Sequence, residues 1–157
     1  MSVARLPLHV FRFHVRFRED SPAGEPGADV PLCGGAFAEC TGLEATMEPK
    51  VIRSGGVNYG AAQRVGTVSF ATVVLKRGMT SAPELWQWWQ LVSGGAYAVR
   101  LAAEIDVLDG SGDRALTWRL RRALPVKFRA APLDARSREV GIEELHLAHE
   151  GLQLMAG

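Results

Sequence analysis

The residues most able to do chemistry in this sequence are its histidines and cysteines, and neither set has the spacing of a metal site. His146 and His149 are three positions apart, so they share a face on a helix but point to opposite sides of a strand. The HExxH order of a zinc protease is absent. Cys33 and Cys40 belong to no CxxC pair and have no histidine at ligand spacing, which favours free thiols over a zinc site or a disulfide. We therefore predict no metal and no cofactor.

Other catalytic patterns are also missing. The sequence has no GxSxG nucleophile elbow, and the glycine-rich stretch 54–66 lacks both phosphate-binding signatures. The acidic stretch 109–113 could suggest calcium, but Arg114 and Leu120 replace the glycine and the closing glutamate of an EF-hand loop. It is better interpreted as a hairpin turn. Carboxylates near the C-terminus are expected on strand surfaces, away from any apolar pocket that would tune them for catalysis: Glu143, Glu144 and Glu150. We predict no catalytic residue and no enzyme activity.

A row of cations is the clearest polar pattern in the chain. Residues 6–18 alternate strictly, as half-buried strands do, with Phe11 and Phe13 on the core face. The opposite face carries Arg12, His14, Arg16 and Arg18. Like charges along one strand need acidic partners or open water. This row is either a solvated sheet face or a surface that meets another subunit or lines a channel. As further interface candidates we take Asn58 and Tyr59, in the glycine-rich stretch.

One helix is predicted, at about 82–94, following a strand that ends near Gly78. Ser81 is a candidate N-cap and Pro83 suits the first turn. Trp88 and Trp89 fall on the apolar helical face, so we expect both in the core. A single helix with a tryptophan-rich face needs a sheet to pack against.

Alternating patterns predict strands over most of the remaining chain. The clearest is a hairpin over 98–122, whose second arm turns Trp118 toward the core. A long bent strand runs to about Arg53, and shorter strands are expected at 126–129 and 138–149. A loop is expected at 19–32, where prolines and glycines argue against strand pairing, and an extended loop at 54–66. The prediction is one mainly β domain, 1–157, with two packed antiparallel sheets forming a β-barrel or sandwich and one flanking helix.

Composition excludes several classes of protein. The chain has 157 residues, enough for one domain with a real core, and 47% are hydrophobic, which argues against disorder. Its 18 basic and 17 acidic residues do not signal a strongly basic nucleic-acid binder. No apolar run approaches the length of a membrane span. Charges interrupt the apolar N-terminal stretch, so we expect no signal peptide and assembly in the cytoplasm.

Five stretches in order resemble the tail tube proteins of contractile phages and of extracellular contractile injection systems. They are FAECTGLE (37–44), IRSGGVN (52–58), LKRGMT (75–80) with the tryptophans after it, WRLRRALPVK (118–127) and EELHLAHEGL (143–152). Each motif is weak alone, but their order along nearly the whole chain is fairly specific. The resemblance implies a β-barrel-like fold with a flanking helix, similar to type VI secretion tube proteins.

The resemblance also implies a passive, structural role. Six subunits would form a ring, and rings would stack into a hollow tube inside a sheath, as a conduit and puncturing shaft. The implied partners are further copies of the chain, sheath and baseplate proteins, and a cargo of protein, or of DNA in a phage. The particle would be released, docked on a membrane, or part of a virion. The family pattern usually has a short hairpin where this chain has 19–32. Both a bulk tube subunit and a tube-initiating ring next to the baseplate therefore remain open.

Two other function classes compete with this interpretation. A β-sandwich could be a non-catalytic binding module that recognises a partner through its loops. An enzyme on an unfamiliar barrel would need a perturbed carboxylate or histidine in a cleft, for which the sequence gives no sign.

Overall fold

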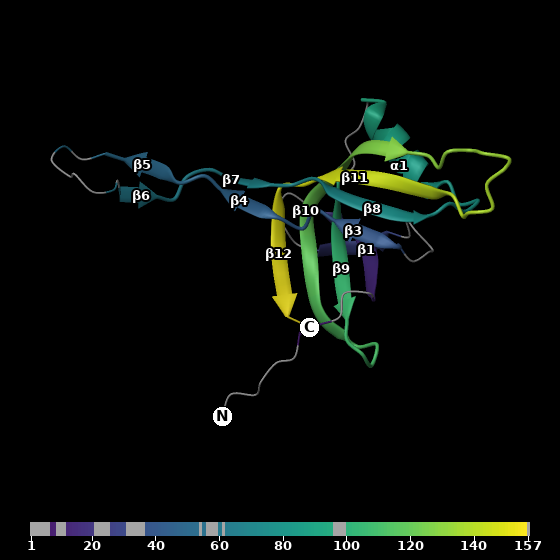
Figure 1. Cartoon of the computed structure of the whole chain (residues 1–157), viewed down its shortest axis with the longest axis horizontal. Helices are drawn as coiled ribbons and strands as arrows, with labels where there is room; N and C mark the ends of the chain where they lie inside the picture. The colour runs from purple at the N-terminus through teal and green to yellow at the C-terminus, as the bar shows by residue number, and fades with distance from the viewer. Residues whose placement is uncertain are drawn as a thin grey trace.

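Strands occupy most of the chain, and one helix covers the core. The computed structural model describes residues 7–8, 12–20, 26–30, 37–53, 55, 60, 62–95 and 100–156 (Figure 1). The strands are β1 (Phe13–Asp20), β2 (Pro26–Val30), β3 (Glu39–Thr41), β4 (Ala45–Met47), β5 (Lys50–Ile52), β6 (Ala62–Arg64), β7 (Val68–Phe70), β8 (Val73–Gly78), β9 (Leu101–Leu108), β10 (Arg114–Arg129), β11 (Ile142–Ala148) and β12 (Gly151–Ala156). The helix is α1 (Glu84–Ser93). The mainly β prediction with antiparallel sheets and one helix is confirmed.

Two sheets share the long strand β10. Its first half pairs with β9 and β12, which with β1 and β2 make sheet I in the order β2-β1-β9-β10-β12. Its second half pairs with β11, which with β8 and β3 makes sheet II in the order β10-β11-β8-β3. The strand bends at Arg122, whose φ of 49° is rare outside glycine. The Arg122 backbone N–H donates to the Asp20 carboxylate at the end of β1, which fixes this bend.

The Asp20 side chain also faces a second arginine. The Arg119 guanidinium on β10 lies 3.8 Å from it, an ion pair too long to be a hydrogen bond, and both side chains are buried. Asp20 therefore links β1 to β10 at the point where the two sheets diverge.

The core lies between the inner faces of the two sheets and the helix. Sheet I contributes Phe17, Leu101, Ala103, Ile105 and Leu120, and sheet II contributes Val73, Leu75, Leu145 and Leu147. Trp88 of α1 meets Phe17 edge-on, with 5.6 Å between ring centroids. The sheets are not closed into one barrel, so the arrangement is an open sandwich with its helix on the core.

The expected core aromatics take different positions. Trp88 is buried, while Trp89 is half-buried and stacks on Trp86. Phe13 and Trp118 are half-buried and pack against the core cluster. Phe11 lies outside the described residues. The helix begins after Pro83 without any side-chain cap, so the expectation of a Ser81 cap was wrong.

Several expected loops contain strands. The range 19–32 includes the end of β1 and all of β2, which pairs with β1 at the edge of sheet I. Proline is tolerated at strand ends and edges, so Pro26 does not prevent this pairing. The strands expected to end at 122 and to begin again at 126 are one strand, because β10 runs through Pro125 from Arg114 to Arg129. The C-terminal tail also forms a strand, β12.

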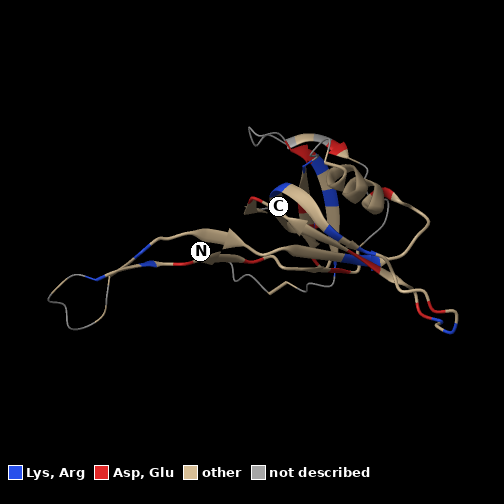
Figure 2. Ribbon diagram, turned by 90° about the horizontal axis from the view of Figure 1, so that it is seen from above, with Lys and Arg blue, Asp and Glu red and all other residues tan. Residues whose placement is uncertain are grey.

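A long β-ribbon leaves the body of the protein. The hairpin that begins as β3 and β8 in sheet II continues outward through β4 and β7 and then β5 and β6 (Figures 1 and 2). At two irregular points the backbones of the two arms approach so closely that only glycine fits. A Cβ on Gly42 would lie 2.2 Å from the Thr72 carbonyl oxygen, and one on Gly66 would lie 1.8 Å from that of Glu48. We call residues 44–70 of this hairpin the ribbon.

Truncation of the central tryptophan tests the core assignment. We expect Trp88→Ala to lower the free energy of unfolding by roughly 3–5 kcal/mol, because the buried indole contacts both the helix and sheet I. The matched control is Leu91→Ala, on the outer side of the same helix, which should cost less than about 1 kcal/mol. Urea unfolding followed by circular dichroism measures both. A loss under about 1 kcal/mol at Trp88 would show that it lies outside the core.

Candidate assembly surfaces

The cation row of β1 meets acids on the neighbouring strand. Arg16 lies opposite Glu104 of β9 in the antiparallel register, next to Asp106. Its guanidinium Nη2 is 2.8 Å from Glu104 Oε2, and its Nε donates to Asp106 Oδ2 at 2.7 Å. Both acids are buried, at 4% exposure, so Arg16 covers charges that water does not reach. The acidic partners that the row requires lie within the same sheet.

Asp106 is the centre of this polar network. It accepts a hydrogen bond of 2.6 Å from the buried Thr117 hydroxyl, and Arg114 Nε lies 3.7 Å away. Burial alone would raise the pKa of Asp106, but the hydrogen bonds from Arg16 and Thr117 outweigh burial and hold that pKa below its ordinary value. The hydrogen bond between Arg16 and Asp106 also raises the pKa of Arg16. Asp106 and Arg16 therefore both stay charged across the physiological pH range.

The rest of the row runs from the half-buried Arg18 to two exposed residues. Arg18 Nε donates to Asp29 of β2 at 2.8 Å, and its Nη1 is 3.8 Å from Glu104. His14 and Arg12 are exposed at the far end of the strand. The row thus runs from half-buried arginines that pair with acids to the exposed His14 and Arg12, and its role as a subunit interface or channel lining stays a prediction. Asn58 and Tyr59 lie outside the described residues.

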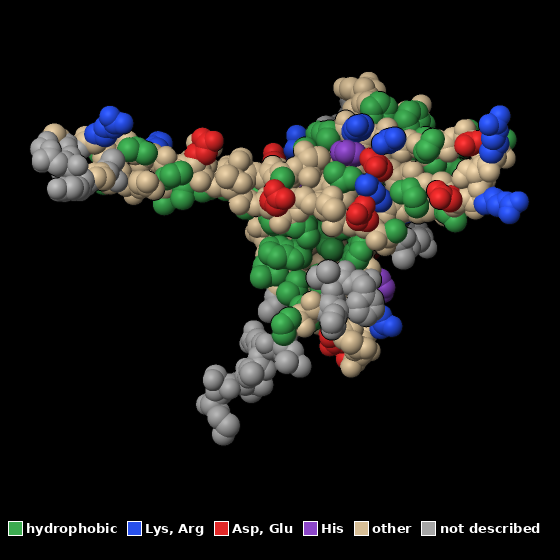
Figure 3. Space-filling model, viewed as in Figure 1, with side chains coloured by type: hydrophobic (Ala, Val, Ile, Leu, Met, Phe, Trp, Pro, Cys, Tyr) green, Lys and Arg blue, Asp and Glu red, His purple; other side chains and the backbone are tan. Residues whose placement is uncertain are grey.

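The ribbon exposes apolar side chains to solvent. They are Met47, Val51, Ile52, Val65 and Val68, each at least 38% exposed. In the space-filling view the ribbon projects from the body with apolar side chains along it (Figure 3). A two-stranded ribbon is marginally stable in water by itself, and clustered exposed apolar residues mark interaction surfaces. The ribbon is thus the strongest candidate contact surface in the described part of the chain.

His149 anchors the base of the ribbon. Its Nε2 lies 3.1 Å from the Ala71 carbonyl oxygen and its Nδ1 lies 3.1 Å from that of Gly151. Its ring also packs on Phe70, with 5.4 Å between centroids. Sequence reasoning considered this histidine only as a metal ligand and missed its structural contact. No sequence signal reveals it, because Ala71 is distant in the chain.

Free strand edges are a second candidate surface. Within the described residues, β2 and β12 end sheet I, and β3 ends sheet II. Among the described strands these three have one neighbour each, and the backbone groups on the other side of such an edge strand readily pair with another chain. Leu154 on β12 is 57% exposed beside the half-buried Trp118, so this edge also carries apolar surface.

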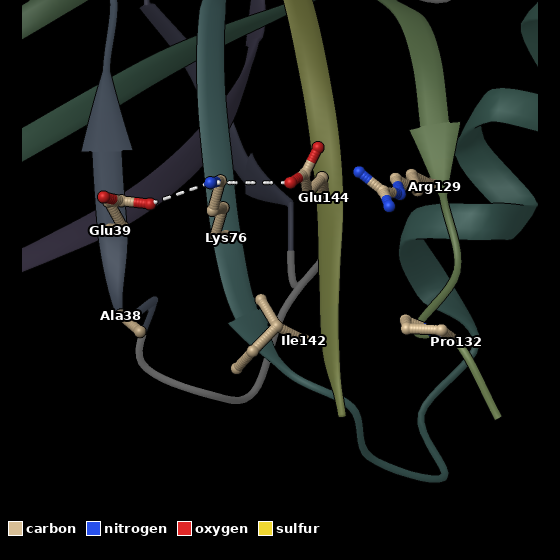
Figure 4. Close-up of a pocket in the computed structure, with 7 residues that line it drawn as sticks. All are labelled: Ala38, Glu39, Lys76, Arg129, Pro132, Ile142 and Glu144. Atoms are coloured by element: carbon tan, nitrogen blue, oxygen red, sulfur yellow. Dashed lines mark ion pairs between the residues drawn. The ribbon is translucent and has the colours of Figure 1, made fainter. Parts of the chain in front are cut away.

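The outer face of sheet II carries a row of alternating charges (Figure 4). Lys76 Nζ on β8 lies 3.2 Å from Glu39 on β3 and 3.5 Å from Glu144 on β11. Arg129 extends the row on β10 along the edge of a shallow depression. Glu39, then Glu144, raises the pKa of Lys76, while a hydrogen bond with His146 lowers that of Glu144. Because neighbouring charges pair, the row joins strands and offers no unpaired acid for catalysis.

A buried ion pair lies on the inner side of the same sheet. Glu143 was expected on the surface, but it is 7% exposed and accepts a hydrogen bond from Arg77 Nε. Arg77 is also buried, and its guanidinium lies 5.9 Å from the centre of the Phe37 ring and 3.4 Å from the Ala82 carbonyl oxygen. The pair therefore ties sheet II to the segment that leads into α1. The expectation for Glu143 was wrong because this residue shares the inward face of β11 with Leu145 and Leu147, where Arg77 pairs with its charge.

No described residues form a metal or redox site. Groups of three or more histidine, cysteine or acidic side chains that could hold a metal are absent from the described ranges. Cys40 is half-buried and free, and burial raises the pKa of its thiol to about 11, so it stays protonated and weakly reactive. Cys33 lies outside those ranges.

Comparison with known proteins identifies a family. Residues 9–153 match the family described as T4-like virus tail tube protein gp19. A chain from the anti-feeding prophage (AFP) baseplate, solved by electron cryo-microscopy with six-fold symmetrisation, is 28% identical; the match covers 99% of this chain and 98% of that one, with a TM-score of 0.75. A search of the curated proteins found no match.

Two further solved structures share the fold. A chain from the sheath–tube complex of an extracellular contractile injection system, PVC, is 21% identical over 96% of this chain and 93% of that chain, with a TM-score of 0.75. Hcp1 from Flavobacterium johnsoniae is 12% identical over 92% of this chain and 96% of that chain, with a TM-score of 0.54.

Among the described residues, no helix has the length and apolar composition to cross a membrane.

The Asp106 network predicts a dependence of stability on pH. The folded pKa of Asp106 is depressed, so its stabilisation is complete above the unfolded value of about 3.9 and is lost as the pH falls through the folded value. We expect Thr117→Val to lower the free energy of unfolding by about 1.5–3 kcal/mol at pH 7, through loss of a hydrogen bond to a charged group. That difference should shrink as the pH falls below about 4.

Urea unfolding at a series of pH values measures this effect. Thr41→Val, an exposed threonine on β3, is the matched control and should change stability by less than about 0.5 kcal/mol. An effect of Thr117→Val that is equally large at pH 3 and pH 7 would contradict the charged network.

Proposed function

Because this chain belongs to the T4-like virus tail tube protein family, a component of contractile, phage-tail-like particles, we propose that six copies form a ring of the inner tube, at its baseplate end. The family match covers residues 9–153, nearly the whole chain. The 28% identical relative comes from a six-fold symmetrised baseplate. The 21% identical relative comes from a sheath–tube complex, and that level of identity supports the fold alone. We therefore favour the tube-initiating ring over a bulk tube subunit.

One observation carries this proposal: the ribbon is a large projecting element whose described strands pair only with each other. It projects from the body while exposing Met47, Val51, Ile52, Val65 and Val68. Further copies of the chain would cover it. The edges of sheet I at β2 and β12 would likewise pair between neighbours, which continues the sheet around the ring.

The ring would act as a conduit for cargo. If sheet I continues between subunits through β2 and β12, its inner face stays in the core and its polar face can line the channel. That face carries Arg16 and Arg18 with their acidic partners, and the exposed Arg12 and His14. Paired charges would leave the lining polar without a strong net attraction for a passing molecule.

The proposed role is passive. Several of the described charged groups pair with each other across strands, as Arg77 does with Glu143 and Lys76 with Glu39 and Glu144. We propose that the protein has no catalytic activity, assembles in the cytoplasm, and contacts sheath and baseplate proteins in the completed particle.

Electron microscopy and sedimentation of the purified protein test the ring. We expect particles with six-fold symmetry, and single rings or short stacks for a tube initiator, since a bulk tube subunit would give long tubes. A sample that stays monomeric at high concentration, without rings in the images, would contradict the proposal.

A charge placed on the ribbon tests the contact surface. Val51→Asp should prevent assembly and leave the melting temperature of the monomer unchanged within about 2 °C, because the side chain is 57% exposed in the single chain. Leu91→Asp on α1 is the matched control, at 53% exposure outside the ribbon and the sheet edges, and should assemble normally. Assembly of Val51→Asp at the parent concentration would show that the ribbon is not part of the interface.

A further inference from the structure

The ribbon joins the body of the protein through a short irregular segment in each arm. Regular strand pairing is interrupted between the β3–β8 pair in sheet II and the β4–β7 pair in the ribbon (Figure 1). We call residues 42–44 and 71–72, which lie in this interruption, the joint. Within it the Ala71 N–H donates to the Glu44 carbonyl oxygen at 3.2 Å, which links the two arms to each other. The direction of the ribbon therefore depends on the contacts that tie the joint to the body.

His149 makes such a contact. It follows β11 directly and lies in the short connection to β12. Its Nε2 lies 3.1 Å from the carbonyl oxygen of Ala71 in the joint, and its Nδ1 lies 3.1 Å from that of Gly151 at the start of β12. The ring therefore bridges the joint and the body. Both partners are carbonyl oxygens, which accept hydrogen bonds and cannot donate them.

Two acceptors require two donors. A neutral imidazole has one N–H, so it can donate to one of the two oxygens, and its other nitrogen then turns a lone pair toward a carbonyl oxygen. The imidazolium has an N–H on both nitrogens and can make both hydrogen bonds. Phe70 adds to this preference, because its ring centroid lies 5.4 Å from that of His149, within the range of a cation–π contact. We propose that the protonated ring of His149 ties the joint to the body, and that loss of its proton loosens the base of the ribbon.

Neighbouring charged side chains do not explain the geometry. The described ones on the elements around the ring are Glu44 in the joint, Glu150 next to His149, and Arg100, Arg121 and Arg122 nearby in sheet I. None of these side chains is a hydrogen-bond partner of the ring among the described residues. Glu150 pairs instead with Arg122 at 2.7 Å and with Arg100 at 3.4 Å. The two carbonyl oxygens are therefore the groups that favour the proton.

Acid tightens the joint and alkali loosens it. The contact prefers the protonated ring, so its stabilisation is fully present below about pH 6.5, the ordinary value for a histidine in an unfolded chain. It is lost as the pH rises and the folded chain releases the proton. Leu43 of the joint still packs against the core cluster, so we expect local loosening and not unfolding. This change would occur in a single chain, with or without ring formation.

Hydrogen exchange read by mass spectrometry measures how firmly the base of the ribbon is held. The full-length protein is used at a concentration where sedimentation shows a single species. The amides of 45–47 and 68–71 are compared at pH values on either side of the loss of the His149 proton, which the ¹⁵N signals of the labelled ring locate. Exchange times are scaled to the intrinsic rate at each pH.

We expect the protection of these amides to fall by about ten-fold when the proton is lost, the effect of one hydrogen bond from a charged donor. Amides of 103–105, in the buried part of β9, should keep their protection. Equal protection of the ribbon base with either form of the ring, or greater protection with the neutral form, would overturn the proposal.

Replacement of the ring assigns the effect to His149. In His149→Gln the pH-dependent step should disappear and protection should stay low throughout, because the amide side chain does not change its charge. His146→Gln is the matched control, a half-buried histidine on β11 whose Nε2 lies 3.3 Å from Glu144, and it should keep the step. A step of the parent size in His149→Gln would overturn the proposal. Should that variant not fold, the comparison of the two ring forms in the parent protein decides by itself.

Discussion

The bend in β10 is the constraint on which the rest of this structure depends. This one continuous strand forms backbone hydrogen bonds with neighbouring strands in both sheets. The angle between the sheets is therefore fixed by the backbone conformation at Arg122. The Asp20 carboxylate holds that bend by accepting the Arg122 N–H, and it places the end of β1 beside β10. The core between the sheets, the packing of Trp88 on Phe17, and the direction in which the ribbon leaves sheet II all follow from that angle.

The polar groups follow the same logic of pairing between strands. Arg16 with Glu104 and Asp106 in sheet I, and Arg77 with Glu143 in sheet II, join strands that are distant in sequence. Buried charges of this kind are costly unless they are paired, and removal of one partner leaves the other unsatisfied. They therefore specify which strands lie side by side, whereas the ribbon and the edges of the described sheets have no such pairs.

Alternation of apolar and polar residues correctly predicted the strands that turn one face to the core, because every second side chain in such a strand is buried. These strands are β1, β8, β9, the first half of β10 and β11. Alternation failed for β2 and β12, which are edge strands whose pairing depends on a neighbour and not on their own pattern. The family was recognisable from motifs in order. The contacts of His149 with the base of the ribbon and the burial of Glu104 and Asp106 depend on register and long-range contacts, which a single sequence does not reveal.

The exposed ribbon also affects the life of the protein before assembly. In a single chain these apolar side chains are exposed to water, and such surface promotes nonspecific aggregation when molecules accumulate. A high concentration of unassembled protein would therefore favour aggregation in the cell. Synthesis matched in timing and amount to consumption, so that each new molecule is incorporated soon after it leaves the ribosome, avoids that accumulation.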